Sequence, residues 1–223
     1  MHTLAVIDFE TTGISPSGGA RATEVAAVLV QGGRIVDRYA SLMNSGARVP
    51  PFIEQLTGIS NAMLADAPLA AGVMREVHAF VAGCGLVAHN AAFDRGFWCA
   101  ELAHAQAAAM AEADRFACTL LLSRRLYPEA PNHRLGTLAD WHDLPRHNRA
   151  HRALADAEVT AHLLLRIQRD VERRFEFELA GHAVDHRLLR SLQRCSAGRL
   201  DRVFAAPAKA PRGHRWRQPV PVA

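Results

Sequence analysis

Apolar and polar residues alternate with a period of two in three segments near the start of the chain, a pattern typical of β-strands. The expected strands cover residues 4–9, 23–31 and 34–43. Gly32 and Gly33, between the second and third segments, favour a tight hairpin turn. We therefore expect the first three strands to form an antiparallel meander.

Beyond residue 50, helical periodicity predominates over strand alternation. Apolar positions three and four residues apart predict helices at 51–56, 60–64, 69–81, 91–110, 119–127, 135–141, 152–176 and 184–195. Two short apolar segments, 85–88 and 116–118, predict buried strands between these helices. A meander followed by strands that alternate with helices indicates an α/β fold, with a mixed sheet flanked by helices.

Composition narrows the class of protein. With 223 residues, of which 49% are hydrophobic, the chain can form one well-packed domain and an appendage. The four cysteines are singly spaced, which indicates neither a zinc site nor a disulfide framework. No apolar run approaches the ~18 residues of a membrane span, and the N-terminus lacks a signal-peptide pattern. We expect a cytoplasmic protein that makes no membrane contact.

The first predicted strand ends in two acidic residues, at positions where an apolar surface is expected. The period of two places Asp8 and Glu10 on the same face as Leu4 and Val6. Two neighbouring carboxylates repel each other and are costly to desolvate unless a cation lies between them. A divalent metal ion is the simplest such cation, and a solvated strand end that leads into a glycine turn is the alternative.

Two further acids lie on the apolar faces of predicted helices. Asp94 shares a face with Phe97, and Asp156 shares one with Leu163. Four converging carboxylates favour a pair of oxygen-preferring divalent ions, magnesium or manganese rather than zinc. Such a pair can activate a water and stabilise the leaving oxygen of a phosphodiester. His151, just before the last of these acids, would be the general base.

Three segments together resemble the motifs of a known family. They are Asp-Phe-Glu-Thr-Thr-Gly at 8–13, His-Asn-Ala-Ala-Phe-Asp at 89–94 and His-Arg-Ala-Leu-Ala-Asp at 151–156. In order and spacing they resemble the DEDDh 3′→5′ exonucleases, particularly the proofreading (epsilon) subunit of bacterial DNA polymerase III. The resemblance covers about residues 3–173 and implies a ribonuclease H-like fold with a five-stranded mixed sheet.

The resemblance also implies a role for individual residues. The implied ligands of two divalent cations, Mg²⁺ or Mn²⁺, are Asp8, Glu10, Asp94 and Asp156, and the implied general base is His151. The implied substrate-binding residues are Thr11 and Thr12 at the terminal nucleotide, Leu56 and Thr57 beside the terminal base, Phe93 near the sugar, and Asn90 as a motif support or a direct contact.

The expected activity is removal of nucleotides from single-stranded or frayed 3′ ends of DNA. Proofreading is a possible role for this activity, with a replicative polymerase subunit as a possible partner. Stacking and backbone contacts between the protein and the last nucleotides would tolerate any base. A mismatched 3′ end would be favoured, because it costs less free energy to unpair than a matched end. RNA is a possible substrate, because an exoribonuclease of the RNase T or oligoribonuclease kind differs in contacts to the 2′-hydroxyl. A non-catalytic module that binds a polymerase or nucleic acid is a third alternative, which the complete set of acids disfavours.

The formal charge of +4 is unevenly distributed along the chain. Residues 1–170 contain 15 basic and 17 acidic residues, whereas residues 171–223 contain 11 basic and 5 acidic ones. We expect an exonuclease domain at 1–176, a helical extension at 177–206 and a disordered basic tail at 207–223. The tail could contact nucleic acid or a partner, and a merely solvated end is the alternative.

Overall fold

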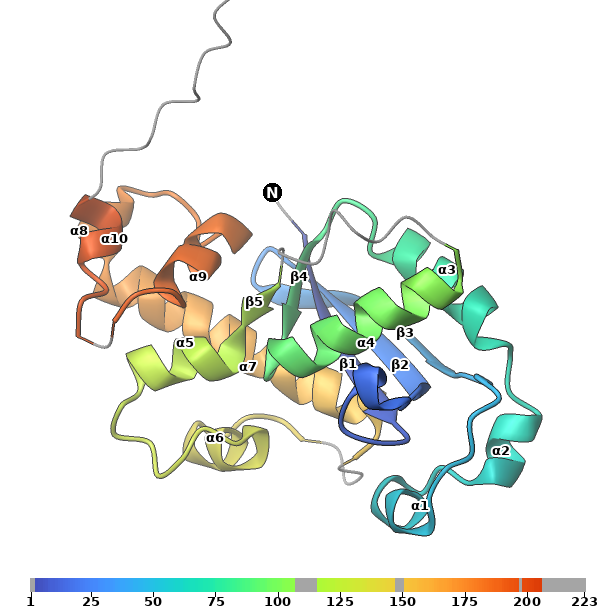
Figure 1. The fold of residues 1–223 in the computed structure, drawn as a ribbon. Coiled ribbons are helices and arrows are strands. Elements are labelled where there is room, and N and C mark those ends of the chain that lie inside the picture. Colours follow the sequence, from blue (N-terminus) through green and yellow to red (C-terminus); the bar gives the residue numbers. More distant parts are fainter. Residues whose placement is uncertain (1–2, 107–115, 147–150, 197, 206–223) are drawn as a thin grey trace, which may run out of the picture.

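The computed structural model describes residues 3–106, 116–146, 151–196 and 198–205, and these residues form one sheet with helices on both faces (Figure 1). Five strands lie in the order β3-β2-β1-β4-β5. Their bounds are β1 Leu4–Thr11, β2 Ala22–Gln31, β3 Arg34–Leu42, β4 Gly85–Ala88 and β5 Ala117–Cys118. The end of the helix expected at 91–110 and the tail at 207–223 lie outside the described residues.

The sheet is mixed. β1 pairs with β2 and β2 with β3 in antiparallel fashion, which confirms the expected meander. β1 pairs with β4 and β4 with β5 in parallel. Because β1, β4 and β5 run in the same direction, their carboxyl ends meet at one edge of the sheet.

The helices follow the expected order. Their bounds are α1 Pro51–Thr57, α2 Asn61–Ala65, α3 Ala70–Phe80, α4 Ala91–His104, α5 Thr119–Leu126, α6 Leu135–Trp141, α7 Ala153–Arg174, α8 Glu176–Leu179, α9 His186–Leu192 and α10 Arg202–Ala205, with a 3-10 turn η1 at Pro16–Gly18. The long helix expected at 152–176 ends at Arg174, and the short α8 follows it. No helix in the described part of the chain has the length and apolar character needed to cross a membrane.

Each face of the sheet has its own hydrophobic core. Val6 and Val28 face one cluster, which contains the apolar side of α7. Ile7 and Ala27 face the other cluster, which contains the fully buried Trp98 of α4. This alternation is the period of two that predicted the strands, and it buries β1 on both faces.

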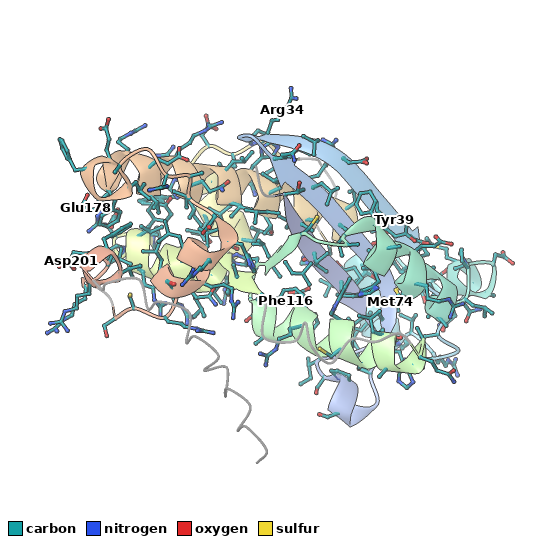
Figure 2. The ribbon with its side chains drawn as sticks, turned by 90° about the horizontal axis from the view of Figure 1, so that it is seen from above. Arg34, Tyr39, Met74, Phe116, Glu178 and Asp201 are labelled. Atoms are coloured by element: carbon teal, nitrogen blue, oxygen red, sulfur yellow. The ribbon has the colours of Figure 1, made fainter. Side chains whose placement is uncertain are left out.

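The C-terminal segment covers the β5 edge of the sheet. The Gln193 side chain accepts a hydrogen bond from the Cys118 amide (2.6 Å) and donates one to the Phe116 carbonyl (3.3 Å). His186 packs over Gly85 so closely that a Cβ there would lie 2.5 Å from the imidazole. Figure 2 shows the segment, marked by Glu178 and Asp201, at the end of the molecule remote from Tyr39.

Glu24, near the start of β2, holds the first turn of α7. Its side chain is 4% exposed and accepts hydrogen bonds from the Arg152 guanidinium (2.6 Å) and the Ala153 amide (3.0 Å). The amide belongs to the first residue of α7 and has no partner within the helix. A charge-assisted contact therefore fixes where α7 begins relative to the sheet.

Glu101 makes the corresponding contact from α4. This side chain is 1% exposed, and its two oxygens accept hydrogen bonds from the Arg21 guanidinium at 2.8 and 2.9 Å. Its Oε1 also accepts one from the Ala22 amide at 3.0 Å. The start of β2 thus anchors both α4 and α7.

Replacement of Glu24 by Ala should lower the free energy of unfolding by roughly 3 kcal/mol, because it leaves the Arg152 charge and the Ala153 amide without their partner. Chemical denaturation of the wild type and the variant measures this difference. Glu178→Ala, which removes an exposed acid on α8, is the control and should change stability by less than about 0.5 kcal/mol. Equal losses in the two variants would contradict the anchoring role.

Candidate active site

The carboxyl end of β1 brings two acids to the edge of the sheet. Asp8 and Glu10 are part-buried and continue the face of β1 that packs against α7. Pairing of β1 with β4 stops at Val6, so the next part of β1 is open on that side. This open stretch is where α4 approaches.

Asp94 comes from the first turn of α4 and reaches the open side of β1. The Asp94 Oδ1 atom accepts a hydrogen bond from the Phe9 amide at 3.2 Å, and Asp94 is 2% exposed. Asn90, with a left-handed φ of 64°, turns the chain from β4 into α4. Asn and Asp adopt this conformation more readily than most residues. The turn therefore brings the Asp94 carboxylate to the β1 backbone at Phe9, the residue between Asp8 and Glu10 in the chain.

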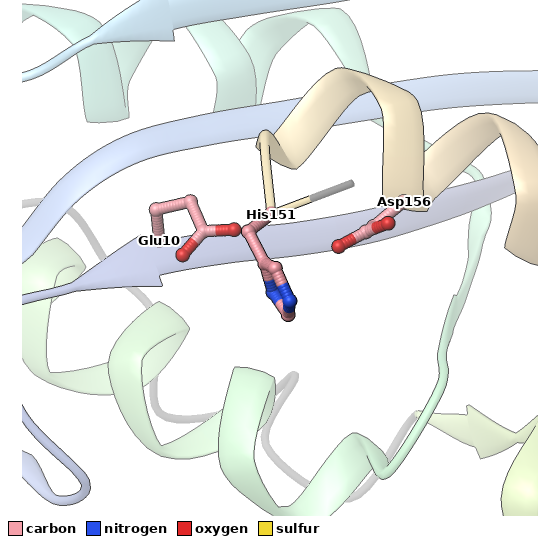
Figure 3. Close-up of side chains that lie close together, drawn as sticks. All are labelled: Glu10, His151 and Asp156. Carbon is pink, nitrogen blue, oxygen red and sulfur yellow. The ribbon is translucent and has the colours of Figure 1, made fainter. Parts of the chain in front are cut away.

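His151 lies two residues before α7, and Asp156 lies in the first turn of this helix. Ligand atoms of Glu10, His151 and Asp156 all lie within 4.8 Å of one another. Figure 3 shows the Glu10 carboxylate on β1 and the Asp156 carboxylate on α7, with the imidazole of His151 beside them. His151 has a left-handed φ of 61° and an exposed side chain, so the imidazole is open to solvent beside the acids.

Burial dominates the electrostatics of Asp8 and Asp94. It raises the pKa of Asp8 well above its usual range, and repulsion from Asp94, Asp156 and Glu10 raises it further. Burial also raises the pKa of Asp94 to about 8, although its hydrogen bond from the Phe9 amide opposes the shift. The carboxylates are therefore close enough to disfavour one another's charge.

The other two acids respond in the same way. Burial raises the pKa of Glu10 to about 7, with repulsion from Asp156 and then Glu24 adding to it and Arg152 opposing it. Burial raises the pKa of Asp156 too, and the neighbouring His151 opposes that shift. A divalent cation among these groups would relieve the repulsion, so the donor set fits such an ion.

The two threonines after Glu10 shape the turn that leaves β1. The Thr11 hydroxyl donates a hydrogen bond to the Gly13 carbonyl at 2.7 Å. The Thr12 amide donates to the Arg21 carbonyl at 2.9 Å, and the Thr12 hydroxyl accepts from the Arg21 amide at 3.0 Å. These bonds fix the turn beside the acids, and nucleotide contact by the threonines stays a prediction.

Phe93 stands one residue before Asp94 on α4. The ring is part-buried and lies 5.0 Å, centroid to centroid, from Phe97, which is fully buried. Packing thus holds the ring in place while part of it remains accessible. Asn90, one turn earlier, is exposed.

Leu56 and Thr57 lie at the end of α1 and differ in exposure. Leu56 is 52% exposed, whereas Thr57 is buried. The Thr57 hydroxyl donates to the Ile53 carbonyl (2.9 Å) and accepts from the Ile59 amide (3.1 Å), which ties it to its own helix end. Leu56 is therefore available to a ligand, and Thr57 supports it. The two hydrogen bonds of the Thr57 side chain stay within this helix end and do not reach the acids.

Two residues outside the expected ligand set hold neighbouring elements in place. His89 donates from Nε2 to the His133 carbonyl (3.0 Å) and accepts at Nδ1 from the Thr119 hydroxyl (2.9 Å), and burial lowers its pKa to about 4. It is a neutral link between β4 and the loop before α6. Glu24 positions α7 through residues 128 and 129 positions away in the chain. The only sign of this positioning role in the sequence was that Glu24 is an acidic residue within the apolar strand expected at 23–31.

Comparison with known proteins identifies the family. The protein-family model with the description "Exonuclease" matches residues 5–164 of this chain. The 3′-5′ exonuclease DinG of Bacillus subtilis (strain 168) is 40% identical over 164 residues, and the DNA polymerase III PolC-type of the same strain is 40% identical over 170 residues. These alignments cover 74% and 76% of this chain but only 17% and 12% of the two relatives.

A solved structure extends the comparison to three dimensions. Exonuclease X, in complex with 5′ overhanging duplex DNA, is 30% identical with a TM-score of 0.58. The match covers 74% of this chain and 91% of that one. The five-stranded mixed sheet and the ribonuclease H-like architecture implied by the motifs are thereby confirmed. This chain belongs to the exonuclease family, as its DEDDh motifs indicated.

Proposed function

We propose that the chain is a metal-dependent 3′→5′ exonuclease that removes nucleotides from DNA. The closeness of Glu10, His151 and Asp156 at the carboxyl end of β1 is the observation that carries this proposal, and the charge repulsion that Asp8 and Asp94 feel from neighbouring acids supports it. Asp8, Glu10, Asp94 and Asp156 would hold two divalent cations, Mg²⁺ or Mn²⁺. Bound there, the cations would polarise the scissile phosphate and lower the pKa of the attacking water.

His151 would receive the proton of the attacking water. Its exposed imidazole lies beside Glu10 and Asp156, where a water and a phosphate could both approach. The water oxygen forms a new bond to phosphorus while the bond from phosphorus to the 3′ oxygen of the preceding nucleotide breaks. A 5′-mononucleotide leaves, and the shortened strand gains a proton at its new 3′-hydroxyl.

The residues around the acids suit a strand end of any sequence. The accessible part of Phe93 and the exposed Leu56 offer apolar contact to a sugar and a base, which discriminates little between bases. Thr11 and Thr12 hold the turn that would border the terminal nucleotide. Single-stranded or frayed 3′ ends are the proposed substrate, and the PolC-type relative supports a proofreading role beside a replicative polymerase.

The direct experiment uses purified protein with single strands labelled at either end. Stepwise shortening of the 5′-labelled strand, with early loss of the 3′ label as a mononucleotide, should require Mg²⁺ or Mn²⁺ and stop in chelator. Matched DNA and RNA strands distinguish a deoxyribonuclease from an exoribonuclease. Shortening from the 5′ end, or cleavage unaffected by chelator, would contradict the proposal.

Replacement of His151 by Ala should lower kcat by about 10² to 10⁴, the range expected for a lost general base. Cation binding, followed as the metal-induced rise in melting temperature, should change little because the four carboxylates remain. His182→Ala, which removes an exposed imidazole from the C-terminal segment, is the control and should retain full turnover. Full activity of the His151 variant near neutral pH would place the base elsewhere.

The raised pKa values of Glu10 and Asp94 predict how stability depends on pH. Their folded-state pKa values, about 7 and about 8, exceed the ordinary values of 4.5 and 3.8. Their contribution to folding stability is thus fully present below about pH 4 and is lost as pH rises through 7 to 8. In chelator, stability should fall between about pH 4 and pH 8, and the double variant Glu10→Gln and Asp94→Asn should flatten that fall.

Divalent cations should reverse this trend, because they bind the ionised carboxylates. The rise in melting temperature on addition of millimolar Mg²⁺ or Mn²⁺ should be larger at pH 8.5 than at pH 6. The double variant should show a smaller rise at both values. A wild-type melting temperature indifferent to cations at pH 8.5 would contradict the metal site.

A further inference from the structure

Two adjoining clefts lie at the same edge of the sheet as the acids. The first, of about 300 Å³, opens between the starts of α4 and α5 and the end of α9. The second, of about 510 Å³, opens between the end of β4 and the loop before α6. Both are lined by Asn90, Leu120 and Arg124, so they form one groove.

The groove is basic. Arg95, Arg124 and Arg194 line the first cleft, and Arg124, Arg134 and His133 line the second, whereas the lining of neither cleft includes an acidic residue. All four arginines are exposed. We call the cleft lined by these four side chains the arginine groove.

The C-terminal segment builds part of this groove. Gln193, in its lining, is fixed by the two hydrogen bonds to the backbone on either side of Ala117 in β5. Arg125 donates from Nε to the Cys195 carbonyl at 2.7 Å, which holds the chain just after Arg194 against α5. Arg194 is therefore presented from a backbone with a defined position.

The groove begins at the start of the helix that carries Asp94. Asn90 lies in its lining, and Asp94 follows one turn later on the same helix. The parallel strands β1, β4 and β5 end at this edge, so the groove continues the line from Asp8 across the ends of β4 and β5. A chain molecule with its end among the acids can extend into it.

We propose that the arginine groove binds the sugar–phosphate backbone of the substrate strand, several nucleotides from its reacting 3′ end. Guanidinium groups pair with phosphate oxygens, and a lining without acids favours a polyanion. Contacts of this kind position a strand without reading its sequence. The inference rests on the proposed function and adds a second point of contact, which makes affinity dependent on strand length.

The test compares the double variant Arg124→Gln and Arg194→Gln with the wild type. Arg34→Gln is the charge control, because Arg34 is exposed at the β2–β3 turn and lies apart from Phe116, a residue of the groove lining (Figure 2). Melting temperatures first establish that the variants fold. Affinity for a 20-nucleotide single strand is then measured by fluorescence anisotropy in chelator, and steady-state kinetics are measured on that strand and on a trinucleotide.

The double variant should bind the long strand about 10-fold more weakly at low salt. The slope of log K against log salt should fall in magnitude by about 1.4, which corresponds to two lost contacts to single-stranded phosphates. Its KM should rise on the long strand and stay unchanged on the trinucleotide, and Arg34→Gln should match the wild type. A double variant that binds the long strand like the wild type would overturn the inference and favour an acidic protein as the occupant.

Two further outcomes would also overturn it. Equal losses on the long strand and on the trinucleotide would show that the arginines act through the reacting end. The double variant could also be inhibited more weakly by a free 5′-mononucleotide while its affinity for the long strand is unchanged. That result would show that the groove binds the product. If the wild type shortens no 3′ end, the proposed function fails, whereas the anisotropy comparison still tests the groove.

Discussion

Mutual repulsion among four carboxylates is the constraint that the rest of this structure must satisfy. Folding moves Asp8 and Asp94 out of water and next to other acids, which raises the pKa of both. Packing on both faces of the sheet has to overcome that cost. The start of β2 contributes as well, because Glu24 fixes α7, which carries Asp156, and Glu101 ties α4, which carries Asp94, to the sheet. The buried ion pairs therefore act on position as much as on stability.

Local sequence patterns could predict most of the architecture and the acids. Alternation predicted the meander, and the acids at positions 8 and 94 stood out because their neighbours on the same face are apolar. The partners of Glu24 could not be predicted in this way, since they lie 128 and 129 residues away. The contact between Gln193 and β5 spans 75 residues and has no periodic signal either. Long-range polar contacts depend on the assembled fold, which a single sequence does not display.

The separation of roles along the chain also follows from the fold. The acids lie where parallel strands end, so their positions are set by the sheet and by two helix starts. The arginine groove is assembled from the start of α4, from α5, from the loop before α6 and from the C-terminal segment. Relatives with the same sheet could therefore retain the acids and vary the groove, since surface segments change at little cost to the core.

Gln193 has a consequence for the association of the chain with copies of itself. An outermost strand presents unpaired amides and carbonyls that can pair with a strand from another molecule. On β5, the Gln193 side chain occupies the Cys118 amide and the Phe116 carbonyl, much as a neighbouring strand would. A protein shortened before α9 would uncover this edge and become prone to strand-to-strand aggregation. The last helices thus protect solubility at the same edge at which they help to build a groove.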